Sequence, residues 1–368
     1  MRYSDPITKK LARKAYRLGC GISVAANIFI PKNNNLAVYY GGARQGDIGG
    51  PLVKVKRLRE HFPQNNWGYN LVYVLSNTPY LSKSSLALLK HRKIPIVHNQ
   101  NGVFYKAWYE GDGIKENDRM ALSYHAADWV FYQSKFCKHA AQLFLGPRSG
   151  SGEVLYNAID TKKFFPREPK HSLVKRDFVF LLTGKIDSHL YYRLESTIKG
   201  LRMANKNGLR SRLKIAGWVE RDIQLRAMDL SKKYGIANKV EFLGPYTQKE
   251  APSIYRAADA YVMTKHNDPC PNTVLEAMSC GLPVLYSNSG GVPELVGDDA
   301  GIGLLCEQSW DSPFVPSAQS IGDGMIEIVE RRKKFSTVAR QRAIDLFDIS
   351  DWIDRHKNIF ERLLMESK

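Results

Sequence analysis

Asp268 and Glu276 are two carboxylates eight positions apart, in the stretch DPCPNTVLEAMSCGLPV. The preceding run AYVMT (260–264) predicts a strand, and Asn272 is predicted to cap a helix that Gly281 ends. Asp268 is therefore expected on the loop before the helix, and Glu276 about one turn inside it. The two acids would then lie on either side of a helix start.

A helix start of this kind favours phosphate. The backbone N–H groups of Thr273, Val274 and Leu275 are expected to point out of the helix, at the positive end of its dipole. Glu276, one turn further in, can accept two hydrogen bonds from a vicinal diol such as ribose, and Asp268 can accept from sugar hydroxyls. The spacing suits a nucleotide-diphosphate sugar, whereas a capped helix with two incidental acids is the alternative for this spacing alone.

The elements that must position these residues alternate along the whole chain. Apolar runs of strand length are separated by helical patterns, which predicts parallel sheets with helices on both faces. In the first half the predicted strands are 35–40, 69–75, 94–98 and 128–133, and the helices 51–62, 81–92, 115–127 and 135–145. In the second half they are strands 177–184, 213–217, 240–244, 260–264 and 282–286, and helices 191–207, 220–235, 248–258, 272–280 and a helical end over 317–366.

This order predicts an α/β protein of two doubly wound, Rossmann-like domains that face each other across a cleft. A proline-ended connector, EVLYNAIDTKKFFP (153–166), separates the halves. We expect a first domain over 1–167, a second over 168–348, and a last helix over 349–368 that crosses back to the first. Ligands of such sheets bind beyond the carboxyl ends of the strands, so the loops after strands are the candidate sites.

The second half resembles the retaining glycosyltransferases of family 4, which have the GT-B fold. The resemblance rests on Asp268-x7-Glu276, on LEAMSCGLPVLYSNSGGVPELV behind it, and on the shorter runs LYNAIDTKKFFP (155–166) and LLTGKI (181–186). Family members have Glu where this chain has Asp268, which is one methylene shorter. The resemblance implies a nucleotide-sugar donor with its ribose on Glu276 and its hexose on Asp268, and transfer with retention of configuration.

The same resemblance implies cations for the diphosphate. Lys185, after LLTG, stands where the family has a phosphate-binding Arg, and Arg193 on the next predicted helix is the second candidate, with Lys199 as the alternative to it. For Arg193 and Lys199 the alternative is a solvated charge on the helix surface without a role in binding. GGVPEL (290–295), with Gly290, Gly291 and Glu294, is another loop-to-helix start that is expected near the donor.

Two features of the first half add to this expectation. The loop GGARQGDIGG (41–50) follows a strand and precedes a helix, and the resemblance places Gly49 and Gly50 against the donor phosphates; a merely flexible loop is the alternative. His98 ends the predicted strand 94–98, where family members often carry a His near the transferred sugar. A structural histidine is the alternative there. The catalytic residues expected are thus His98, Asp268 and Lys185.

The formal charge is +18, and residues 1–165 carry 24 Lys and Arg against 10 Asp and Glu. Such a half attracts anions, either nucleic acid, an anionic membrane surface or phosphorylated substrates. ITKKLARKAYRL (7–18) predicts a basic amphipathic helix, followed by the mostly apolar LGCGISVAANIFI. It is interpreted as a helix packed on its domain, with a membrane-surface helix and a signal sequence as alternatives.

Several classes of protein lack support in the sequence. The five cysteines are scattered without a C-x-x-C pair, and no run reaches the length of a membrane span, which predicts a cytoplasmic protein that is at most peripheral to a membrane. No Asp-x-Asp motif occurs, so we expect metal-independent transfer and no cofactor. The residues do not indicate the base of the donor nucleotide, for which UDP or GDP is expected. The acceptor is expected to be a glycan or a lipid-linked sugar. The alternatives are another GT-B enzyme, such as a sugar-nucleotide epimerase, and a basic nucleic-acid-binding protein, although no nucleic-acid-binding motif is present.

Overall fold

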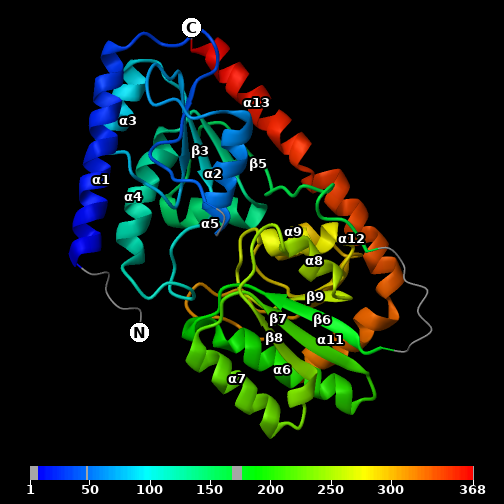
Figure 1. Cartoon of the computed structure of the whole chain (residues 1–368). Helices are drawn as coiled ribbons and strands as arrows, with labels where there is room; N and C mark the ends of the chain where they lie inside the picture. The colour runs from blue at the N-terminus through cyan, green and yellow to red at the C-terminus, as the bar shows by residue number, and fades with distance from the viewer. Residues whose placement is uncertain (1–6, 47–48, 168–175, 368) are drawn as a thin grey trace. The chain divides into compact units, whose positions relative to one another are not determined.

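The computed structural model describes residues 7–46, 49–167 and 176–367. The chain divides into two compact units (Figure 1), which are described in turn. The first unit is Met1–Tyr156 together with Ser350–Lys368, and the second is Asn157–Ile349.

The first unit contains a five-stranded parallel sheet whose strands follow chain order, β1-β2-β3-β4-β5. Its strands are β1 (Val38–Tyr39), β2 (Leu71–Leu75), β3 (Ile96–Gln100), β4 (Trp129–Tyr132) and β5 (Gly152–Val154). Its helices are α1 (Ile7–Ala26), the short 3-10 helix η1 (Asn27–Phe29), α2 (Gly50–His61), α3 (Lys83–His91), α4 (Gly113–Ala126), α5 (Lys135–Leu145) and the last helix α13 (Ile349–Glu366).

Helices cover both faces of this first sheet. On one face the buried His356 of α13 accepts or donates a hydrogen bond with the Tyr73 hydroxyl of β2, over 3.1 Å, and packs on Phe131 of β4. On the other face His98 of β3 packs edge-on against Tyr124 of α4. Because successive residues of a strand point to opposite faces, the apolar runs of these strands are buried on both sides.

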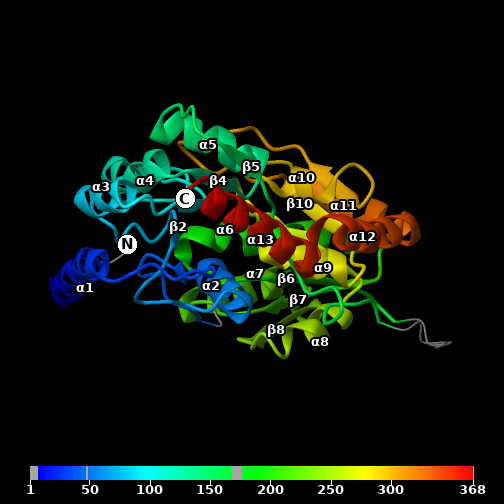
Figure 2. The ribbon, with the colours of Figure 1, turned by 90° about the horizontal axis from the view of Figure 1, so that it is seen from above.

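The N-terminal helix lies at the border of the first unit, beside α3 (Figures 1 and 2). The structure continues this helix to Ala26, so the basic segment and most of the apolar run behind it form one helix. Cys20 and Val24 form its buried face, and the Tyr16 hydroxyl donates to the carbonyl of Gly42 over 2.6 Å. Within the described residues, none of the helices combines the length and the apolar character that crossing a membrane requires.

The second unit contains a six-stranded parallel sheet in the order β11-β10-β9-β6-β7-β8. Its strands are β6 (Phe178–Thr183), β7 (Ser211–Ala216), β8 (Val240–Gly244), β9 (Ala260–Met263), β10 (Val284–Ser287) and β11 (Gly301–Leu304). Its helices are η2 (Ser188–Leu190), α6 (Tyr191–Lys206), α7 (Arg221–Lys233), η3 (Ala237–Lys239), α8 (Ala251–Arg256), α9 (Asn272–Ser279), α10 (Val292–Val296), α11 (Ala318–Glu330) and α12 (Arg332–Phe347).

The direction of winding reverses in the middle of this second sheet. From β6 the chain builds outward through β7 and β8, and it then returns to place β9 on the other side of β6. The point between β6 and β9 is therefore a topological switch point, where the loops after the two strands diverge and leave room for a ligand.

Most predicted strands are confirmed, with two omissions and some wrong boundaries; β1, for example, covers only Val38–Tyr39 of the predicted 35–40. β5 was expected only as connector, and the glycine-containing GIGL of β11 was not predicted, because short segments with glycine carry little strand signal. The prediction that His98 ends its strand is wrong: β3 runs on to Gln100, since Asn99 and Gln100 pair with Phe131 and Tyr132 of β4.

Candidate functional site

Lys185 follows β6 at the switch point of the second unit. Its side chain is exposed, with Nζ 5.0 Å from the ring centre of Trp218. The loop that carries Lys185 packs closely against the loop after β7. A Cβ atom on Gly217 would lie only 2.2 Å from the carbonyl oxygen of Gly184. Glycine at 217 therefore lets the loop after β6 sit close to the loop after β7.

Arg193 is the cation that the structure brings to this loop, and Lys199 is not. Arg193 is 3% exposed, its Nη2 donates to the carbonyl of Thr183 over 3.3 Å, and its Nη1 lies against Gly184. Lys199, a turn and a half further along α6, forms an ion pair of 2.7 Å with Glu195 on its own helix. The choice between the two predicted cations therefore favours Arg193 on position.

The helix start after β9 differs in detail from the prediction. Asn272 is the first helical residue rather than the cap, the cap position is Pro271, and no side chain caps this end. The Val274 N–H donates to the Pro271 carbonyl over 3.1 Å, so it is not one of the amides left to a ligand. Asn272 and Thr273, both half-buried, begin the helix, and the first amides of a helix have no partner within it.

Glu276 is 4% exposed and is oriented by a tyrosine that the sequence did not indicate. The Tyr255 hydroxyl donates to its Oε2 over 2.7 Å, and the Thr183 hydroxyl in turn lies 3.2 Å from that of Tyr255 and 2.9 Å from that of Tyr261. Burial, reinforced by the Glu276 carboxylate, raises the pKa of Tyr255 well above its usual value, so the phenol stays a donor. Tyrosines in apolar strand and helix patterns look like ordinary core residues, which is why sequence reasoning missed this network.

Asp268 is held by contacts on both its side chain and its backbone. Its Oδ2 pairs with Lys265 at 2.8 Å, and the Gly291 N–H donates to its carbonyl over 2.9 Å. The preceding Asn267 has φ +53°, a conformation that non-glycine residues seldom adopt. A Cβ atom on Gly290 would lie 2.5 Å from the Asp268 carbonyl oxygen, so glycine at 290 lets the two loops approach closely.

The far end of α9 is fixed to the connector that enters the unit. The Arg340 guanidinium donates to the carbonyls of Ser279 and Phe164 over 2.8 Å each, and to that of Thr161 over 3.1 Å. A cation on the last carbonyls of a helix also complements the helix dipole. The start of α9 is thus held in place by an anchor at its end.

Polar atoms without partners gather at the carboxyl end of β9. Arg193 Nε, Thr264 Oγ1 and Asn272 Oδ1 are buried and have no hydrogen-bond partner in the described part of the chain. Nη2 of Arg193 lies 3.9 Å from the sulfur of Met263, the last residue of β9, and Thr264 follows directly. Buried polar groups are normally satisfied, so unsatisfied atoms at the end of β9 and at the start of α9 indicate a place for a polar ligand.

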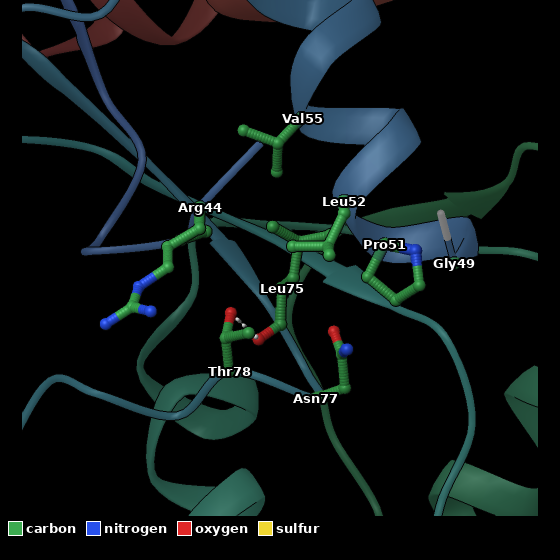
Figure 3. A pocket seen from close by; sticks show the side chains of 9 residues that line it. Arg44, Gly49, Pro51, Leu52, Val55, Leu75, Asn77 and Thr78 are labelled. Carbon is green, nitrogen blue, oxygen red and sulfur yellow. Dashed lines mark hydrogen bonds between the residues drawn. The ribbon is translucent and has the colours of Figure 1, made fainter. Parts of the chain in front are cut away.

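Gly49 and Gly50 lie at the start of α2 in the first unit, beside a cavity of about 220 Å³ (Figure 3). Gly49 has φ +93°, and a Cβ atom there would meet nothing within 4 Å. Figure 3 shows Asn77 pointing toward Pro51 and Leu52, with Thr78 bonded to the Leu75 carbonyl. The cavity is lined by Ala43, Arg44, Gly49, Pro51, Leu52, Val55, Leu75, Asn77 and Thr78.

His98 has no exposed surface. Its Nε2 lies 2.8 Å from Oε1 of Gln100, its Nδ1 is buried without a partner, and burial lowers its pKa to about 4. A neutral ring enclosed in this way has no surface to offer a sugar. Among the described residues, no three His, Cys, Asp or Glu side chains are grouped so as to hold a metal ion.

Residues 166–342 match the family model described as glycosyl transferases group 1. The D-inositol 3-phosphate glycosyltransferase of Saccharomonospora viridis is 38% identical over 78 residues, which are 21% of this chain and 18% of that protein. Its counterpart from Actinosynnema mirum is 40% identical over 76 residues, again 21% of this chain and 18% of the relative. The matched segments thus span less than a fifth of the relatives' length.

Solved structures resemble the chain over most of its length. HepE from Anabaena, solved in complex with UDP, has a TM-score of 0.63 at 18% identity, covering 85% of this chain and 82% of its own. A glycosyltransferase from Rickettsia africae has a TM-score of 0.63 at 15% identity, with 87% and 84% covered. The sucrose-phosphate synthase of Thermosynechococcus elongatus has 0.62 at 17%, with 82% and 75% covered. At these identities the likeness shows the fold, which is that of the GT-B proteins.

Proposed function

We propose that this chain, whose residues 166–342 match the group 1 glycosyl transferases, moves a hexose from a nucleotide-diphosphate sugar to an acceptor hydroxyl. One observation carries the proposal. Lys185 and Arg193 after β6 flank the same switch point as the start of α9 and Glu276 after β9. Cations, helix amides and an oriented carboxylate are the groups that a diphosphate and a ribose require.

The donor is proposed to lie across the switch point. The diphosphate would contact Lys185, Arg193 and the amides of Asn272 and Thr273, and it would satisfy the buried donor atom Nε of Arg193. The ribose diol would donate to Glu276, whose orientation Tyr255 fixes. The hexose hydroxyls would donate to Asp268, on the loop that precedes α9.

Transfer is proposed to occur with retention and without a metal ion. The acceptor oxygen would form its bond to the anomeric carbon on the face from which the diphosphate leaves, while the acceptor proton passes to a departing phosphate oxygen. The charge that develops on the leaving diphosphate would be stabilised by Lys185, Arg193 and the α9 dipole, groups that are already in position before the reaction. His98, enclosed in its sheet, takes no part in this scheme.

UDP is the nucleotide proposed for the donor, with GDP as the alternative. HepE, which shares the fold, has been solved in complex with UDP and with UDP-glucose. Binding of UDP-glucose and other nucleotide sugars to the full chain, measured by thermal shift with and without EDTA, tests the donor. Glu276→Gln is expected to remove the stabilisation, and the matched control Glu327→Gln, half-buried on α11, to keep it.

Donor binding and sugar transfer are tested by different measurements. NMR of the product would show whether the anomeric configuration is kept, and loss of turnover in EDTA would contradict metal independence. If no nucleotide sugar stabilises the wild type, or if Glu276→Gln binds as well as the wild type, the donor site as described here is wrong. Release of free UDP without consumption of the acceptor would indicate hydrolysis of the donor rather than transfer.

The acceptor is proposed to be glycan or lipid-linked and presented at an anionic membrane surface on the cytoplasmic side. Leu11, Leu18 and Ile22 form a stripe on α1 and are 61%, 67% and 62% exposed, on the side away from the buried Cys20 and Val24. An apolar stripe on a basic helix favours the boundary of an anionic bilayer.

Vesicle sedimentation tests this membrane contact. Leu18→Glu is expected to weaken binding to vesicles containing phosphatidylglycerol, because it places a negative charge in the apolar stripe. Leu225→Glu on α7, where the leucine is 51% exposed, is the matched control. Equal retention of the two variants by anionic vesicles would contradict the proposal.

A further inference from the structure

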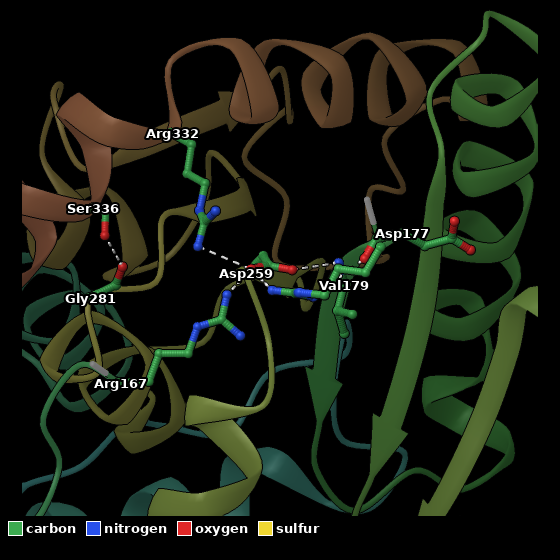
Figure 4. Close-up of polar contacts among 8 residues, drawn as sticks. Arg167, Asp177, Val179, Asp259, Gly281, Arg332 and Ser336 are labelled. Carbon is green, nitrogen blue, oxygen red and sulfur yellow. Dashed lines mark hydrogen bonds and ion pairs between the residues drawn. The ribbon is translucent and has the colours of Figure 1, made fainter. Parts of the chain in front are cut away.

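Three arginines converge on a single buried carboxylate in the second unit (Figure 4). Oδ1 of Asp259 lies 2.7 Å from Nη2 of Arg167, 2.6 Å from Nη2 of Arg176 and 3.0 Å from Nη2 of Arg332. Asp259 comes directly before β9, and Arg176 two residues before β6. The cluster therefore lies at the amino ends of the same two strands whose carboxyl ends form the switch point.

The charges of this arginine cluster do not balance. Asp259 is 2% exposed and supplies one negative charge, whereas the three guanidinium groups supply three positive charges. The other carboxylate oxygen, Oδ2, is occupied by the backbone N–H of Val179 over 2.9 Å, so all three arginines share Oδ1. One oxygen has two lone pairs, and three cations around it repel one another.

The arginines also retain unused donors. Each guanidinium has five N–H groups in a planar fork, and their side chains are 37% exposed for Arg167, 46% for Arg176 and 42% for Arg332. Arg176 uses one further donor, since its Nη1 lies 3.3 Å from the carbonyl oxygen of Asp177, and the Arg332 guanidinium lies over the ring of Phe178. A purely structural clamp on Asp259 would need only one or two of these side chains.

We propose that the arginine cluster, Arg167, Arg176 and Arg332 around Asp259, is a second anion site that binds a phosphate group. Forked donors that converge from three directions, with an excess of two positive charges, match the oxygens of a phosphate monoester. Asp259 fixes the guanidinium groups before the ligand arrives, which lowers the ordering cost of binding. Both a free phosphate ester and a phospholipid head group present this chemistry.

Titration of the full chain with inorganic phosphate at constant ionic strength tests the site. Arg176→Gln is expected to weaken phosphate binding about tenfold, since a charge-assisted hydrogen bond is lost. The matched control is Arg210→Gln, a neighbouring arginine that is 69% exposed and pairs with Asp177 at 3.5 Å; it is expected to bind as the wild type does. Phosphate binding that is lost in Lys185→Ala but kept in Arg176→Gln would belong to the donor site, so a failure of the donor proposal would not be mistaken for a failure of this one.

A second variant gives an independent reading. Asp259→Asn leaves three unneutralised cations, so its melting temperature in chloride buffer is expected to fall, and phosphate is expected to raise it by more than in the wild type. Vesicles of phosphatidylcholine with and without phosphatidic acid distinguish the sources: retention that needs both phosphatidic acid and Arg176 indicates a head group. If free phosphate binds in a way that depends on the arginine cluster, but the vesicles do not retain the protein, the ligand is a soluble phosphate ester.

Two results would overturn the proposal. One is equal phosphate affinity for wild type, Arg176→Gln and Arg210→Gln, which would show that the cluster does not bind the anion. The other is an equal phosphate-induced shift in melting temperature for the wild type and Asp259→Asn, which would show that the cluster only neutralises Asp259.

Discussion

Gly290→Ala is expected to displace Asp268 and so to lower turnover by more than its effect on thermal stability explains. Gly290 has φ +68°, and an added Cβ atom would lie 2.5 Å from the Asp268 carbonyl oxygen and 2.8 Å from the carbonyl carbon of Asn267. Both neighbours are backbone atoms, so the loop itself must move by about 1 Å to reach ordinary contact. A displacement of about 1 Å of a group that contacts substrate costs on the order of 100-fold in rate.

Gly235 offers a matched control for this substitution. It also has φ +68°, but a Cβ atom there meets nothing within 4 Å, so Gly235→Ala carries the same backbone strain without the clash. That strain is worth about 1–2 kcal/mol for an alanine in the left-handed region. Both variants should therefore lose thermal stability, and only Gly290→Ala should lose function.

The assay compares two ligands on the full chain. For Gly290→Ala, the affinity for the nucleotide sugar is expected to fall toward that for the nucleoside diphosphate alone, because the hexose contact at Asp268 is lost while the Glu276 and diphosphate contacts remain. Turnover of the sugar nucleotide should fall roughly 100-fold. The reasoning is refuted if Gly235→Ala and Gly290→Ala lose the same turnover, or if Gly290→Ala loses affinity for both ligands equally.

Three further predictions concern the buried polar groups. Arg340→Met should lower the free energy of unfolding of the second unit by roughly 3 kcal/mol, measured by thermal or urea unfolding, because three carbonyls lose a charged donor; Lys334→Met, an exposed pair partner, should have much less effect. Tyr255→Phe should weaken UDP binding about tenfold in calorimetry and also lower the melting temperature, because the buried Glu276 carboxylate loses a donor; unchanged affinity would contradict the role given to this hydroxyl. Burial lowers the pKa of His98 to about 4 from 6.5, so on acidification the unfolded chain binds a proton before the folded chain does. The free energy of unfolding should therefore fall by about 3 kcal/mol as the pH drops from about 6.5 to 4. His98→Asn should make the dependence of stability on pH less steep over this range, and a dependence as steep as that of the wild type would contradict the prediction.

Element type and order were largely predictable because the strands are buried on both faces. Continuous apolar runs such as NLVYVL and FVFLLT predict parallel strands from local sequence alone. The switch point between β6 and β9 could not be read from the sequence, since strand order depends on which elements pair across long separations. The sequence nevertheless selected residues that lie at that point, Lys185 and Arg193 among them.

The details of the site depended on packing that a pattern does not encode. Asn272 looked like a cap, but Pro271 occupies the cap position and Asn272 is the first residue of the helix. The pattern GGVPEL indicated a loop near the donor, but it did not indicate that Gly290 packs closely against the backbone of Asp268. The orientation of Glu276 by Tyr255 depends on a contact between residues 21 positions apart, which neither residue type reveals.

The last helix has a consequence for how the chain is synthesised. One face of the first sheet is covered by α13, where His356 meets Tyr73 at a separation of 283 residues and Arg355 forms two bonds of 2.8 Å with Glu153. A ribosome that adds 5–20 residues per second needs roughly 10–40 s to translate the second unit between them. During that interval the first unit lacks its cover and exposes apolar strand residues, so the nascent chain is open to chaperones and to aggregation until α13 leaves the ribosome.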